Sequence, residues 1–233
     1  MENEIRKKTR TIRTYTFYAE LKGFEPKIWR RFQINAKRTM SDFASAVLVM
    51  FRMQFEYPYS IIEERDENLN MNRFIENIKR NKRVQDLWKK FNNDKSKNAV
   101  IYSTHEDVDK SIFNDKEKYY VDYDKISVDN VTDNTNWKAT LHYDEKNAWE
   151  VLISLESVDD VEWNKTKLLR VIDGECYGII ENVGGVDGLA DFVDIYNEGK
   201  GRAYSDFCEK YDFEEFDIRK FDIKLINKEL DDL

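Results

Sequence analysis

The sequence contains few of the residues that build disulfide-held or metal-held structures. Among 233 residues there are two cysteines, Cys176 and Cys208, and two histidines, His105 and His142. The cysteines lie too far apart in sequence to show a metal-binding spacing, and two cysteines do not form the framework of a secreted scaffold. We therefore predict no metal centre and a reducing, cytoplasmic environment.

Proline, glycine and long apolar runs are also scarce. Two prolines and eight glycines argue against long disordered linkers. The chain shows neither an apolar N-terminal segment nor an apolar run of the roughly 20 residues that a spanning helix needs, so we expect no signal peptide and no membrane partner. Hydrophobic residues make up 41% of the chain and aromatic residues 14%, which is enough for a packed core.

The chain is acidic overall, and its charge is unevenly distributed. The formal net charge of −8 argues against a general nucleic-acid coat. Residues 1–40 nevertheless contain eleven Lys/Arg and four Glu, whereas residues 173–233 contain seventeen acidic and seven basic residues. Such a distribution can steer a charged partner, although two solvated faces are the commoner explanation.

Hydrophobic periodicity predicts an α+β fold, with a mixed or antiparallel sheet packed against helices. Alternating apolar residues in "RTYTFYAELKG" and "KIWRRFQI" predict one hairpin, and "TNWKATLHYD" and "NAWEVLISLES" predict a second, joined through "DEKN". Thr39 or Ser41 is expected to cap the first helix, and Asp187 and Gly199 are expected to begin and end a later one. Further strands are expected at 57–65, 98–104 and 166–174, and helices at 38–55, 186–199, 203–212 and 221–233.

We expect a single domain over residues 1–233, in which 13–65 and 135–231 form the core and 66–134 a helical or irregular insertion. Within the insertion, residues 78–97 contain eight basic and two acidic residues. Their apolar residues have helical spacing, so a packed amphipathic hairpin with solvated charges is the simpler interpretation. The alternative is a phosphate-facing surface on which an aromatic side chain stacks a base. Its residues would be Lys79, Arg80, Lys82, Arg83, Trp88, Lys89 and Lys90.

Three motifs follow one another in a recognisable order. They are "PKIWRRFQI" with the helix "TMSDFASAV", then "HYDEKNAWEVLISLE", and then "IENVGGVDG" ahead of "FDIKLINKEL". With this set the chain resembles the plasmid pRiA4b ORF-3-like family over residues 13–65 and 135–231. Members of that family occur on plasmids, transposons and other mobile elements. The resemblance implies a mobile-element accessory protein, and no particular reaction.

The chain departs from the family pattern at polar positions. The family's central motif reads Tyr-Asp-Phe-Gly-Asp-x-Trp-x-His, and here Glu-Lys-Asn replaces Phe-Gly-Asp while Val151 stands at the His position. Asn182 replaces the Asp of the third motif. Asn cannot act as a base or a charged ligand, and Val can do neither. The resemblance therefore implies that a metal or acid–base centre of the family has been disabled here, and that the segment which carried it is retained as scaffold.

Several residues of these motifs are still candidates for a site. Asp144 and Glu181 could form a carboxylate pair if the fold brings them together, and His142 lies beside the first, but turn and cap hydrogen bonds are the commoner role. "VGGVDG" could cradle an anion or form a tight turn with positive φ. Trp29 and Arg31 share one face of a strand, as a stacked pair or as a ligand site. The candidate binding residues are Trp29, Arg31, Tyr143, Trp149, Asn182, Gly184 and Gly185.

These observations support three hypotheses. The first is a non-enzymatic accessory protein that binds a protein or ribonucleoprotein, for example a counter-defence inhibitor of the anti-CRISPR type. The second is a nuclease or hydrolase that uses Asp144 and Glu181 with Mg²⁺ or Mn²⁺, the one hypothesis that requires a cofactor. The third is a DNA- or RNA-binding accessory protein that acts through residues 78–97.

Overall fold

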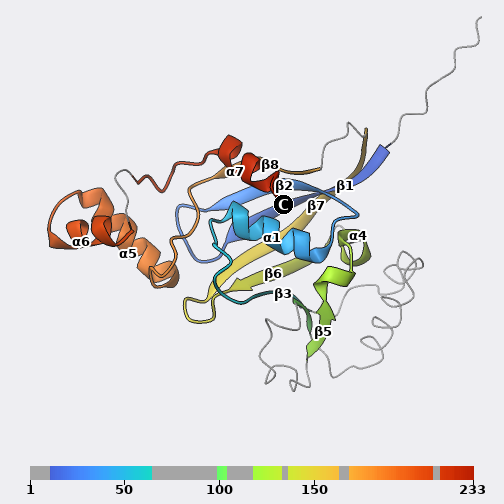
Figure 1. Ribbon diagram of the computed structural model, residues 1–233, viewed down its shortest axis with the longest axis horizontal. Coiled ribbons are helices and arrows are strands. Elements are labelled where there is room, and N and C mark those ends of the chain that lie inside the picture. The colour runs from blue at the N-terminus through green and yellow to red at the C-terminus, as the bar shows by residue number, and fades with distance from the viewer. Residues whose placement is uncertain (1–10, 65–98, 104–117, 133–135, 163–167, 212–215) are drawn as a thin grey trace, which may run out of the picture.

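The computed structural model describes residues 11–64, 99–103, 118–132, 136–162, 168–211 and 216–233 (Figure 1). Its strands are β1 (Thr11–Leu21), β2 (Trp29–Asn35), β3 (Tyr59–Glu64), β4 (Ala99–Ser103), β5 (Lys118–Asp122), β6 (Lys138–Tyr143), β7 (Trp149–Glu162) and β8 (Leu169–Glu175). They form one sheet in the order β5-β4-β3-β6-β7-β1-β2-β8. Neighbours are antiparallel except for β4 and β5, which are parallel. The predicted mixed sheet is confirmed.

Helices accompany this sheet. They are α1 (Met40–Met50), the single turn α4 (Val128–Val131), α5 (Gly185–Glu198), α6 (Arg202–Tyr211) and α7 (Ile223–Leu230), with a 3-10 turn η3 (Tyr123–Lys125). In Figure 1, α1 crosses the middle of the sheet and α7 lies over β8. The predicted α+β class is therefore confirmed.

The core lies between α1 and the sheet because both elements present apolar side chains there. Alternate residues of β1, including Phe17, point inward and are fully buried. The Phe17 ring meets the rings of Phe43 in α1 and Trp137 before β6 at centroid distances of 4.9 and 5.6 Å. Thr39 caps α1: its hydroxyl accepts the Asp42 N–H, and the Asp42 carboxylate accepts the Thr39 N–H. Of the two expected caps, Thr39 is confirmed.

The start of α5 differs from the prediction. Asp187 lies inside the first turn, and Gly184 is the N-cap with φ +105°. The chain enters the helix through the left-handed region, which Gly adopts without the steric cost of a Cβ atom. At the other end, Gly199 with φ +63° ends the helix as predicted.

The segment expected to be an insertion contributes to the sheet. Within residues 66–134, β4 and β5 extend the sheet beyond β3, and η3 and α4 follow. Tyr123 of η3 and Val128 of α4 are buried in the main core. Residues 66–98, which include the predicted basic helices, lie outside the described residues.

Helices α5 and α6 form an arm beyond one end of the sheet (Figure 1). Phe192 of α5 is fully buried and holds the arm together. Its ring lies 5.3 Å from Phe207 of α6 and 5.1 Å from Phe216, measured between centroids. None of the described helices has the length and apolar character needed to cross a membrane.

Candidate functional site

The second and third motifs meet at one corner of the fold. The Tyr143 hydroxyl, at the end of β6, donates a hydrogen bond to Glu181 Oε1 at 2.7 Å. The turn before α5 packs directly on the β6–β7 turn, since a Cβ atom at Gly185 would lie 2.6 Å from the Asn147 carbonyl oxygen. Gly184 and Gly185 both have positive φ, +105° and +72°, as predicted for a tight turn.

Asp144 shapes the β6–β7 turn. It is 3% exposed and has φ +55°. One carboxylate oxygen accepts the backbone N–H groups of Lys146 at 3.1 Å and Asn147 at 3.4 Å, and the other accepts the Asn147 side-chain amide. Both oxygens are thus engaged in local hydrogen bonds, the role that the sequence favoured for this carboxylate.

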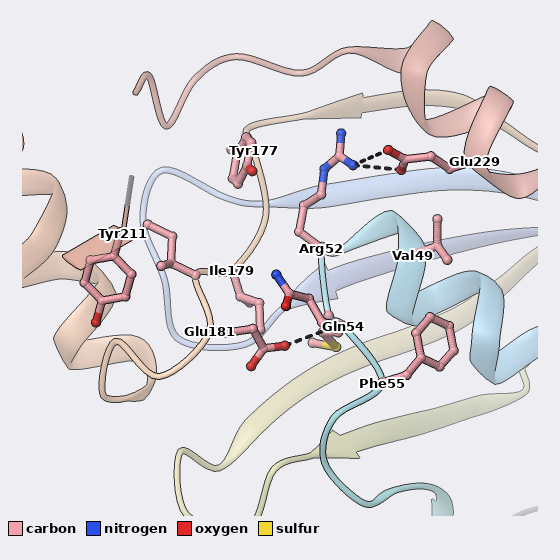
Figure 2. A pocket seen from close by; sticks show the side chains of 11 residues that line it. Val49, Arg52, Gln54, Phe55, Tyr177, Ile179, Glu181, Tyr211 and Glu229 are labelled. Atoms are coloured by element: carbon pink, nitrogen blue, oxygen red, sulfur yellow. Dashed lines mark hydrogen bonds and ion pairs between the residues drawn. The ribbon is translucent and has the colours of Figure 1, made fainter. Parts of the chain in front are cut away.

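Only one of the two carboxylate oxygens of Glu181 accepts hydrogen bonds from the described residues. Oε1 accepts hydrogen bonds from Tyr143 and from the Gln54 N–H at 3.0 Å (Figure 2). Burial, and then this hydrogen bond to Glu181, raise the pKa of Tyr143 well above its ordinary value, so the phenol is a permanent donor. Oε2 is buried and accepts no hydrogen bond from any part of the chain that the structure describes.

His142 does not join these carboxylates. Neighbouring residues of a strand face opposite sides of the sheet, and His142 lies on the outer side, with Nδ1 3.6 Å from a Glu150 oxygen. Val151, at the family's His position, is fully buried opposite Leu141. Among the described residues, no three His, Cys, Asp or Glu side chains are grouped to hold a metal ion.

Asn182 also serves the local backbone. Its φ is +59°, a conformation that Asn tolerates better than most residues. Its side-chain oxygen accepts the Tyr57 hydroxyl at 2.6 Å, and its carbonyl accepts the Tyr211 hydroxyl at 3.0 Å. The residue that replaces the family's Asp therefore anchors the loop between β8 and α5.

Trp29 and Arg31 share the outer face of β2, as predicted. The Arg31 guanidinium lies 5.4 Å from the Trp29 ring and donates to both Glu156 oxygens, at 2.6 and 2.9 Å. The stacked pair is thus also an ion pair with the Glu of the second motif. Trp149 and Tyr143, two other candidates, are buried in the core at 0% and 1% exposure.

Arg30 is an important residue that the sequence analysis left without a role. It is fully buried on the inner face of β2, and burial lowers its pKa to about 9. The guanidinium lies 4.3 Å from the centre of the Phe221 ring. It donates hydrogen bonds to the backbone carbonyls of Trp29, Met50, Glu175 and Tyr177. The sequence held one sign of this burial. Side chains alternate along a strand, so Arg30 had to lie on the other face of β2 from Trp29 and Arg31.

A cavity of about 580 Å³ opens beside Glu181 (Figure 2). Arg52 Nη1 donates to both oxygens of Glu229, at 2.8 and 2.7 Å, on one wall. The backbone after α1 is constrained here, since Arg52 and Phe55 have φ of +65° and +62°. The lining residues are Val49, Arg52, Met53, Gln54, Phe55, Tyr177, Ile179, Ile180, Glu181, Tyr211 and Glu229.

Helix α5 carries a row of carboxylates, which we call the acidic stripe. The stripe consists of Asp187, Asp191, Asp194 and Glu198, all exposed. Spacings of four, three and four residues place them on one helix face. None of them forms an ion pair with a residue that the structure describes. The basic candidates Lys79, Arg80, Lys82, Arg83, Trp88, Lys89 and Lys90 lie outside the described residues.

The fold and the motif contacts define an α+β protein built on the three motifs. The chain belongs to the plasmid pRiA4b ORF-3-like protein family, whose pattern matches residues 13–225. It is similar to the crystal structure of the protein of unknown function MM3350 from Methanosarcina mazei Go1, with a TM-score of 0.66 and 18% identity. That match covers 92% of this chain and 98% of the other, and at this identity it shows a shared fold alone. No curated protein matches the sequence.

Proposed function

We propose that this protein acts by binding a basic surface of a protein or ribonucleoprotein partner, without catalysing a reaction. The acidic stripe is the observation that carries the proposal. Its four exposed carboxylates run along roughly 16 Å of helix, at about 1.5 Å per residue. The arm formed by α5 and α6 projects from the sheet, so this face of α5 is accessible (Figure 1). A fixed row of negative charge complements a basic groove and accelerates encounter with it.

The hydrogen bonds of the motif residues support a non-catalytic role. A general base or a metal ligand needs a carboxylate oxygen directed at the substrate or ion. Both Asp144 oxygens are instead directed at its own turn. Asn182 stands where the family pattern has an acid, and its side chain accepts a hydrogen bond from Tyr57. Val151 stands where the pattern has a histidine, and it is packed in the core.

The specific form of the proposal is a counter-defence inhibitor of the anti-CRISPR type that works in the cytoplasm. Mobile elements, with which this family is associated, gain from blocking host nucleases. CRISPR nucleases hold guide and target in a positively charged channel. The acidic stripe would compete with nucleic acid for part of that channel.

The test is DNA cleavage by a panel of purified, guide-loaded CRISPR nucleases in the presence of this protein. We expect cleavage by the target nuclease to fall with the wild type and to recover with D187N/D191N/D194N/E198Q. The variant E25Q/D124N/E145Q/D160N removes the same charge from scattered exposed positions and should still inhibit. Full cleavage throughout the panel would refute the counter-defence function, and equal loss in both variants would refute the role of the stripe.

A second measurement addresses the wider proposal. The tagged protein is used to capture partners from a bacterial lysate, with and without nuclease treatment. A stoichiometric protein retained by the wild type and lost with the stripe variant would support binding through α5. Recovery of nucleic acid alone would contradict it and would favour the basic segment 78–97.

A further inference from the structure

The cavity beside Glu181 contains an uncompensated negative charge. Three charged side chains line it: Arg52, Glu229 and Glu181. The charge of Arg52 is balanced by Glu229, to which its Nη1 donates two hydrogen bonds. Glu181 forms no ion pair with any residue in the described ranges, and its hydrogen bonds come from a neutral hydroxyl and a backbone N–H. The cavity is therefore suited to a cation.

Two buried polar atoms of the lining lack partners among the described residues. One is an acceptor, Glu181 Oε2, and the other is a donor, Arg52 Nε. A buried polar group without a hydrogen bond is costly, so these two atoms mark a place where a ligand adds stability. That ligand has to donate one hydrogen bond and accept another.

The other lining residues are apolar or aromatic, apart from Gln54. Phe55 stands at the rim with 44% of its surface exposed, although its φ of +62° is unusual for an aromatic residue. Tyr211 of α6 lines the opposite wall (Figure 2). Aromatic faces attract cations, and they stack best on a planar guanidinium. The volume of about 580 Å³ lies within the range of small-ligand sites.

We propose that this cavity receives an arginine side chain of the partner. The guanidinium donates to Glu181 Oε2, and the main-chain carbonyl of the same residue accepts from Arg52 Nε. Since Glu181 Oε2 and Arg52 Nε are both buried, these two contacts require the side chains that cover them to move. The inference rests on the proposed function, and it identifies the partner's arginine as the side chain that anchors the complex in this cavity. Glu181 lies in the loop that leads into α5, six residues before Asp187, the first carboxylate of the acidic stripe.

The test is a calorimetric and NMR titration of the full chain with a blocked arginine, N-acetyl-arginine methylamide. We expect saturable binding, weaker binding of the blocked lysine, and none of the blocked glycine. Glu181→Gln keeps an acceptor for Tyr143 and Gln54 but removes the charge. It should weaken arginine binding about tenfold or more. Asp160→Asn makes the same charge change at an exposed position of β7, outside both the cavity and the acidic stripe, and should bind like the wild type.

A second variant keeps the test valid if Glu181→Gln fails to fold. Phe55→Gly removes an exposed ring and relieves a positive φ, and we expect it to weaken arginine binding several-fold. Absence of saturable binding, or equal weakening by Glu181→Gln and Asp160→Asn, would overturn the proposal. The titration contains no nuclease. Lost arginine binding with intact nuclease inhibition would refute the anchor alone, and arginine binding without inhibition would support the anchor while refuting the counter-defence function.

Discussion

At the scale of single residues, Arg30 shows how one buried side chain of a motif can connect several elements of the fold. Its guanidinium donates to four backbone carbonyls, which belong to β2, the end of α1, the end of β8 and the segment after β8. The planar five-donor group suits this task because the carbonyls surround it. Phe221, from the closing family motif, covers its face. Two family motifs are thus joined through one buried cation.

We expect Arg30→Lys to lower the free energy of unfolding by about 2–4 kcal/mol, because an ammonium group cannot satisfy all four carbonyls in a buried site. Arg31→Lys is the matched control. Arg31 is partly exposed and pairs with Glu156, so its replacement should cost about 1 kcal/mol or less. Urea unfolding followed by circular dichroism gives both values. Equal losses in the two variants would contradict the structural role assigned to Arg30.

Glu63 makes stability depend on pH. Burial raises its pKa from 4.5 to about 7, although a hydrogen bond from Tyr102 at 2.8 Å acts in the opposite direction. The folded state then binds a proton more readily than the unfolded state, so the contribution of Glu63 is most favourable below pH 4.5 and is lost as the pH rises to 7.

The measurement is a series of urea unfolding curves between pH 4 and pH 8 for the wild type and Glu63→Gln. As the pH rises across this window, the unfolding free energy of the wild type should fall relative to that of Glu63→Gln. The difference should then level off. A constant difference would show that Glu63 titrates alike in both states.

At the scale of elements, the turn into α5 determines where two motifs meet. Gly185 lies against the Asn147 carbonyl with φ +72°, so this position combines a close approach with a left-handed backbone. Gly199, at the other end of α5, has a similar φ of +63° but open space around it. The two positions therefore separate the effect of contact from that of conformation.

Alanine at Gly185 should destabilise the protein by about 2–4 kcal/mol, because a Cβ atom would clash with backbone in a conformation that Ala disfavours. Alanine at Gly199 should cost about 1 kcal/mol from conformation alone. Thermal unfolding of the two variants tests this order. Similar costs would mean that the β6–β7 turn yields to the added methyl group.

The elements that could be predicted from the sequence are those with one buried face. In β1, β2, β6 and β7 the apolar residues alternate because one side of each strand faces the hydrophobic core. The start of α5 was misassigned because Asp187 is a favourable cap residue, whereas the chain enters through Gly184. The cavity was missed because Arg52, Glu181 and Glu229 lie far apart in sequence and come together only in the folded chain.

At the scale of the whole molecule, the acidic stripe lies away from the hydrophobic core. The apolar core lies between the sheet and α1, and the acidic stripe lies on an arm beyond the sheet (Figure 1). The net charge of −8 adds a long-range field of the same sign. Such a field acts on the rate of encounter with a basic partner more than on the lifetime of the complex.

Association with a basic surface should therefore depend strongly on salt. With an immobilised deca-arginine peptide as the probe, we expect the association rate constant of the wild type to fall about tenfold or more as the salt concentration rises from roughly 0.05 to 0.5 M. The dissociation rate constant should change little. The variant D187N/D191N/D194N/E198Q should associate more slowly at low salt and show a flatter dependence, whereas E25Q/D124N/E145Q/D160N, with the same net charge, should lie closer to the wild type. If both variants had the same salt dependence in surface plasmon resonance, net charge alone would control encounter, and the placement of four carboxylates along α5 would have no special role.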